Sequence, residues 1–257
     1  MNSTQHVKRF SKLALGLAIG AVAMMEHAPS HGQTSAATQR ESASDTLSMR
    51  QQAIVPIAAF GASGDMARLA TALNQGLDAG LTVNDAKEVL IQLYAYAGFP
   101  RSLNALNELM KVVEARKQRG IQDAQGQLPG RPIPTGEALL AAGTANQTKL
   151  LGGPAKGAIY DFAPVVDQYL KSHLFGAIFE RDNFDWQSRE LATVGMLSAL
   201  PGADAQLQAH MGFSMNVGIT AGQLDQLTKV LATKVDGQAA TRAHDALARQ
   251  LASRTKS

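Results

Sequence analysis

Two side chains capable of joint acid–base chemistry, Glu190 and His210, stand in separate apolar stretches of the sequence. Glu190 begins "ELATVGML" and His210 lies within "QAHMGFSM". If these stretches form consecutive antiparallel helices, the carboxylate and the imidazole can hydrogen-bond, which fixes the imidazole tautomer. Such a pair can deliver a proton to a substrate carbon. The alternative is a structural polar pair that only satisfies its own hydrogen bonds between two helices.

Three further residues are candidates for binding a substrate carboxylate. Arg101 follows Pro100 at a predicted helix start, where a guanidinium and free backbone N–H groups can bind an anion. His173 could line the same cavity as His210, and Arg189 precedes Glu190 directly. Ordinary surface roles are the alternatives for Arg101 and His173. For Arg181 and Arg189 the alternative is pairing with Asp182, Asp185 or Glu190.

The elements that must position these residues are all predicted to be helices. Apolar residues recur at helical spacing between short breaks of Gly, Pro, Asp or Asn, and no stretch alternates as a strand would. The helices are expected near 46–60, 65–79, 83–97, 101–118, 155–180, 186–199, 203–217, 221–235 and 239–253, with one short helix near 136–142. The sequence therefore predicts an all-α fold.

Several predicted helix ends carry the residues that favour them. Thr82 and Thr220 stand where N-caps belong, and Gly80 and Gly218 stand where the preceding helices end. Pro100 is suited to the first turn of the helix that follows it.

The sequence also indicates an internal duplication of a helical domain. A shift of 138 residues places Gly64 on Gly202 and Leu93 on Leu231, together with both caps and both helix stops. It predicts two tandem helical domains over 46–119 and 155–257, joined by a connector over 120–154. Convergence on a common helical hairpin is the alternative.

Under the same shift, Glu190 falls on Gln52 and His210 falls on Ala72. The first copy therefore lacks the acid–base pair. We expect it to serve as a scaffold and as a wall of the site in the second copy.

The N-terminus is typical of a secretory signal. Lys8, Arg9 and Lys12 precede an apolar run over 13–25, which is shorter than the roughly 20 residues that span a bilayer. We predict a signal peptide over 1–32, a disordered lead-in over 33–45 and a periplasmic or secreted protein without a membrane anchor after cleavage. A buried N-terminal helix is the alternative.

Composition and residue spacing limit the classes of function that the chain can have. The formal net charge of +3 falls to about +1 once residues 1–32 are removed, and no basic block remains to predict nucleic-acid binding. The sequence has no cysteine, so thiol chemistry and disulfides are excluded. His173, Glu190 and His210 lack the spacing of a metal motif, and neither a metal nor another cofactor is predicted.

Residues 182–231 resemble the carboxymuconolactone decarboxylase family, on an Arg-Glu-Leu at 189–191 and a His followed by Gly-Ile-Thr at 218–220. Residues 47–106 resemble the same domain. The resemblance implies an all-helical tandem protein with an alkylhydroperoxidase-D-like fold, assembled as a homotrimer. In the thiol peroxidase branch of this family a Cys-x-x-Cys pair precedes the histidine. Ala203 and Gln206 occupy those positions here, which disfavours a peroxidase.

The resemblance thus implies a cofactor-free decarboxylase that acts on a small carboxylated lactone or a related acid, with Glu190 and His210 as the catalytic pair. The alternative is an exported ligand-binding or assembly protein that keeps the scaffold without turnover.

Overall fold

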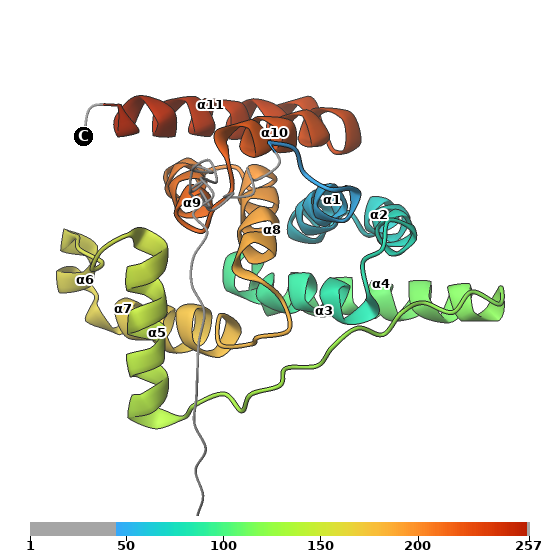
Figure 1. Ribbon diagram of the computed structural model, residues 1–257, viewed down its shortest axis with the longest axis horizontal. Coiled ribbons are helices and arrows are strands. Elements are labelled where there is room, and N and C mark those ends of the chain that lie inside the picture. Colours follow the sequence, from blue (N-terminus) through green and yellow to red (C-terminus); the bar gives the residue numbers. More distant parts are fainter. Residues whose placement is uncertain (1–44, 256–257) are drawn as a thin grey trace, which may run out of the picture. The chain divides into compact units, whose positions relative to one another are not determined.

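The computed structural model describes residues 45–255, whose regular secondary structure consists of helices, without strands (Figure 1). The predicted signal over 1–32 and nearly all of the lead-in over 33–45 lie outside the described residues. The elements are α1 (Met49–Ser63), α2 (Met66–Asp78), α3 (Val83–Gln92), α4 (Tyr94–Gln118), α5 (Gly136–Leu151), α6 (Ala158–Phe162), α7 (Pro164–Tyr169), the π-helix η1 (Leu170–Ile178), α8 (Trp186–Ser198), α9 (Asp204–Asn216), α10 (Ala221–Lys234) and α11 (Gly237–Arg254).

The predicted caps and helix stops are confirmed, but the helix expected near 83–97 already ends at Gln92 and the next begins at Tyr94. Thr82 and Thr220 both form capping boxes, in which the hydroxyl accepts from the backbone N–H three residues later. Gly80 and Gly218 have φ values of 92° and 95°, a region that glycine enters without a Cβ clash. Pro100 stands just after Gly98, whose non-helical backbone divides α4 into two helical parts.

The helices of the first half (α1–α4) and the second half (α8–α11) correspond under the 138-residue shift. The bounds of α2, shifted in this way, coincide with those of α9, and α3 and α10 begin at equivalent residues. Packing also corresponds, since α1 packs on α2 as α8 packs on α9, and α3 packs on α4 as α10 packs on α11.

The two halves share one hydrophobic core instead of packing as separate bodies. The equivalent helices α1 and α8 lie against each other, and Figure 1 shows both beneath α10. A Cβ at Gly195 would lie only 2.9 Å from the Val55 carbonyl oxygen, so this glycine permits the close approach. The buried core residues of both halves belong to one cluster. Common ancestry of the halves stays a prediction.

The segment between the halves differs from the prediction. The single helix expected over 155–180 is wrong: it is divided into α6, α7 and η1, since Pro164 cannot donate a helical N–H and opens α7. The short helix expected near 136–142 extends through Leu151 and packs along η1. A Cβ at Gly143 would overlap the Lys171 carbonyl oxygen, so this contact requires glycine.

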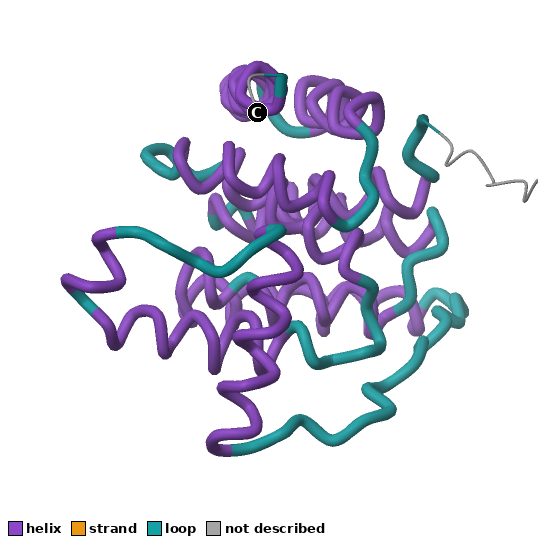
Figure 2. Tube along the Cα trace, turned by 60° about the vertical axis from the view of Figure 1, so that its left-hand side comes forward, coloured by secondary structure: helices purple, strands orange, loops and turns teal. Residues whose placement is uncertain are grey.

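An extended stretch over 120–135 joins α4 to α5 and is the long loop of Figure 2. It is held at intervals: the backbone N–H groups of Val83 and Asn84 donate to the carbonyls of Ala124 and Gln125. Further on, Gly130 and Arg131 both donate to the carboxylate of Asp182. The loop therefore follows a defined path over the helices.

Within residues 45–255, no helix has both the length and the hydropathy needed to cross a membrane.

Candidate active site

Glu190 and His210 meet between α8 and α9. The Nδ1 atom of His210 lies 2.8 Å from the Oε2 atom of Glu190. The hairpin that brings them together turns through Gly202, which has a φ of 85°. Asp185 caps α8 one turn before Glu190, since its carboxylate accepts from the backbone N–H of Ser188. The predicted proximity of the carboxylate and the imidazole is therefore present.

The pair is buried but not sealed. Glu190 is fully buried, whereas His210 retains 7 % of its surface. The Oε1 atom of Glu190 is fully buried and has no hydrogen-bond partner, whereas the Nε2 atom of His210 is not fully buried. Since Nε2 also has no hydrogen-bond partner within residues 45–255, it keeps accessible surface and a free donor or acceptor site. This is the geometry of an oriented imidazole that can exchange a proton.

Aromatic rings enclose His210 on two sides. The ring centroid of Phe213 lies 4.9 Å away and that of Tyr96 lies 5.7 Å away, both in edge-to-face contact. Tyr96 comes from α4, so the first half supplies a wall of the site in the second half. Burial, and then the negative charge of Glu190, raise the pKa of Tyr96, so its hydroxyl stays neutral. This hydroxyl accepts from Thr193 at 3.2 Å.

A second layer covers this aromatic wall. Helix α5 and the π-helix η1 form a small hydrophobic cluster of Leu150, Leu174, Phe175, Ile178 and Phe179, against which Tyr94, Tyr96 and Phe213 pack. Asn216 at the end of α9 also donates to the carbonyl of Leu150. The segment between the two halves therefore covers the aromatic side of the Glu190–His210 pair.

Arg189 belongs to a buried ion-pair network. Its side chain is fully buried and donates to Glu88 at 3.1 Å, while Arg181 donates to both oxygens of the same carboxylate. The suggested pairing of Arg181 and Arg189 with Asp182, Asp185 or Glu190 is therefore wrong. Glu88, on α3, is the partner that the sequence did not indicate. Arg189 is thus committed to an internal carboxylate.

The electrostatics of this network favour a charged Glu88. Burial alone raises the pKa of Glu88, but hydrogen bonds from Arg181 and the charge of Arg189 outweigh it and hold the pKa below its usual value. Burial lowers the pKa of Arg189, and the charge of Glu88 counteracts this effect. Because Arg189 directly precedes Glu190, its pairing with Glu88 fixes the backbone of α8 beside Glu190.

The other two predicted substrate-binding residues lie apart from the pair. Arg101 donates from Nη1 to the carbonyl of Ala62 at 2.5 Å, at the end of α1. His173 is exposed on η1, with its ring against that of Tyr169 at 5.8 Å between centroids. A guanidinium that caps a helix end and an exposed imidazole can still bind a ligand there, but the structure does not bring either residue to His210.

Three polar residues around the pair escaped sequence analysis. Gln92 donates to the hydroxyl of Thr193 and to the carbonyl of Arg189, and Thr193 in turn donates to Tyr96. The contacts of Gln92 and Tyr96 cross from one half to the other, and no spacing in the sequence encodes such contacts. The helical period alone could have placed Thr193 on the same helix as Glu190.

Among residues 45–255, no group of three or more acidic or histidine side chains could hold a metal ion. Compared with models of known protein families and with curated protein sequences, the chain matches none. The resemblance to the carboxymuconolactone decarboxylase family therefore stays a prediction.

Proposed function

We propose that the chain is a cofactor-free acid–base enzyme of the carboxymuconolactone decarboxylase type, acting on a small carboxylated lactone or a related acid. One observation carries this proposal: the buried Glu190 carboxylate lies 2.8 Å from Nδ1 of His210, while Nε2 of the same ring keeps accessible surface. A merely structural pair has no need for an imidazole nitrogen left without a partner.

The chemistry requires only these two side chains. Loss of CO₂ from the substrate leaves its electron pair on the adjacent carbon, conjugated with the lactone carbonyl. Nε2 of a protonated His210 donates a proton to that carbon, and the neutral imidazole regains one from solvent. Glu190 accepts from Nδ1 throughout, holding the tautomer and stabilising the imidazolium. The aromatic rings of Tyr96 and Phe213 limit the water around the reacting carbon.

An assay of CO₂ release from a panel of small carboxylated lactones tests this function. We expect turnover by the wild type, and a loss of about 10²–10⁴-fold in kcat for His210→Ala. His244→Ala is the matched control, because His244 is an exposed histidine on α11. Full activity in His210→Ala, or no turnover of any member by a folded wild type, would leave the exported binding protein as the better reading.

The proposal includes export and assembly. Export is supported by the sequence of residues 1–32 and is tested by N-terminal sequencing of the protein recovered from fractionated cells. A homotrimer is supported by exposed apolar side chains, such as Phe162 at 88 % and Met110 at 65 % exposure. Light scattering of the purified protein measures the assembly, and a monomer at all concentrations would contradict it.

A further inference from the structure

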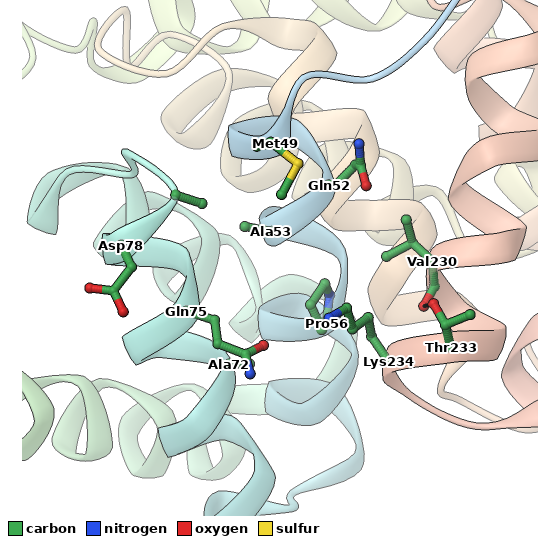
Figure 3. Close-up of a pocket in the computed structure, with 11 residues that line it drawn as sticks. Met49, Gln52, Ala53, Pro56, Ala72, Gln75, Asp78, Val230, Thr233 and Lys234 are labelled. Carbon is green, nitrogen blue, oxygen red and sulfur yellow. Dashed lines mark hydrogen bonds between the residues drawn. The ribbon is translucent and has the colours of Figure 1, made fainter.

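The first half carries an open groove at the positions that correspond to the Glu190–His210 pair. Its volume is about 410 Å³, and Gln52 and Ala72, the counterparts of Glu190 and His210, both line it. The floor comes from α1 and α2, and Val230, Thr233 and Lys234 of α10 form the opposite wall (Figure 3). Because pockets for small ligands run from roughly 300 Å³ upward, this groove suits a small molecule.

Differences in side-chain size explain why the groove is open. At the Glu190–His210 pair, the rings of Phe213 and of Tyr96 from α4 pack edge to face against that of His210. Their counterparts under the 138-residue shift are Ala72, Gln75 and Lys234, none of which carries a ring, and all three line the groove. Equivalent helices therefore pack aromatic rings around His210 but leave a groove beside Ala72.

The groove combines apolar walls with one cation that is free to bind. Ala53, Pro56, Ala72 and Val230 are apolar, and Figure 3 shows Lys234 extending from α10 toward Pro56. No acidic partner of Lys234 is present within residues 45–255. Asp78 also lines the groove, but its carboxylate pairs with Arg116 at 2.8 Å, a guanidinium that it shares with Asp123, and not with Lys234. An apolar molecule with a single negative charge complements this surface.

We propose that this groove is a binding site for a small monocarboxylic acid with an apolar body. The ammonium of Lys234 pairs with the carboxylate, and the walls from α1, α2 and α10 enclose the apolar part. Since Gln52 and Ala72 replace the catalytic pair, the site binds such acids without converting them. This binding proposal does not depend on the proposed decarboxylase activity, and it can be tested even if the protein decarboxylates no substrate.

The experiment is calorimetric titration of the purified protein with benzoate, with uncharged benzamide as the comparison ligand. We expect benzoate to bind, benzamide to bind about tenfold more weakly, and Lys234→Met to weaken benzoate about tenfold. Lys229→Met is the matched control, because Lys229 is on the same helix but pairs with Asp225 and does not line the groove. It should leave the affinity unchanged.

Blocking the groove provides the second arm. Ala72→Phe fills the floor, and Thr233→Trp fills the rim from an exposed position in case the buried substitution impairs folding. Either folded variant should abolish benzoate binding, while His210→Ala should retain it. Absence of benzoate binding in the wild type would overturn the proposal. So would unchanged affinity in Lys234→Met or in a folded, blocked variant.

Discussion

The two equivalent regions of this protein show how one arrangement of helices can yield a buried polar pair and an open groove. In the second half, Glu190 and His210 are hydrogen-bonded and covered by the rings of Tyr96 and Phe213. In the first half, Gln52 and Ala72 border a groove of about 410 Å³. The bounds of α2 and α9 and the capped starts of α3 and α10 agree between the regions, so side-chain volume and polarity make the difference.

The two equivalent sites differ in buried charge as well. Glu88, Arg181 and Arg189 form an ion-pair network behind the Glu190–His210 pair. The counterparts of Glu88 and Arg189 are Gln226 and Gln51, and both of these side chains accept from backbone N–H groups near the start of α1. A neutral amide can fill such a position without an ionic partner, whereas each buried ion requires one.

The largest expected effect is on catalysis. The experiment tests whether Glu190 and His210 act as one unit. We expect Glu190→Gln and His210→Ala each to lower kcat substantially, and the double variant to lose no more than the worse single variant, about 10²–10⁴-fold in all. Steady-state kinetics on a lactone that the wild type turns over measures this. Gln52→Ala and Ala72→Ser at the equivalent positions should leave kcat unchanged. Additive losses would show independent roles.

The next effect is on stability and compares Arg189 with its counterpart Gln51. Arg189→Met leaves the buried Glu88 with only part of its compensation, so we expect the free energy of unfolding to fall by about 3–5 kcal/mol. Gln51→Met removes one exposed capping contact and should cost less than about 1 kcal/mol. Urea denaturation measures both. Equal costs would contradict the difference in buried charge between the two equivalent sites.

A smaller effect concerns the pH dependence of stability. The folded-state pKa of Glu88 lies below its ordinary value of 4.5, so its charge stabilises the fold fully above about pH 4.5. As the pH falls below that value, the unfolded chain takes up the proton first and the stabilisation is lost. Urea denaturation of the wild type and Glu88→Gln from about pH 7 to about pH 3 should show a difference that shrinks in acid. A constant difference would exclude this role.

The smallest effect compares Tyr96 with its counterpart Lys234. Tyr96→Phe keeps the ring against His210 but removes the acceptor for Thr193, which retains other hydrogen bonds, so we expect a loss of about 1 kcal/mol. Lys234→Met at the exposed groove should change stability by less than about 0.5 kcal/mol. Thermal unfolding resolves the two. A larger cost at Lys234 would show that its charge supports the fold.

Much of the helical frame followed from local patterns. The N-caps Thr82 and Thr220 and the stops Gly80 and Gly218 act on their own helix ends, so short-range sequence predicts them. The pattern over 155–180 predicts one helix because its apolar residues continue through the break at Pro164. The excess length of α5 depends on packing against η1, which no local signal reports.

The sequence by itself determined the all-helical frame, its caps, the 138-residue correspondence and the pairing of Glu190 with His210. These depend on the helical period and on neighbours in one hairpin. Only the tertiary structure decided that Arg189 pairs with Glu88, that Tyr96 from the first half forms a wall of the site, and that a groove opens at Ala72. Each of these contacts joins helices far apart in the chain, and the shape of packed side chains, not residue spacing, specifies them.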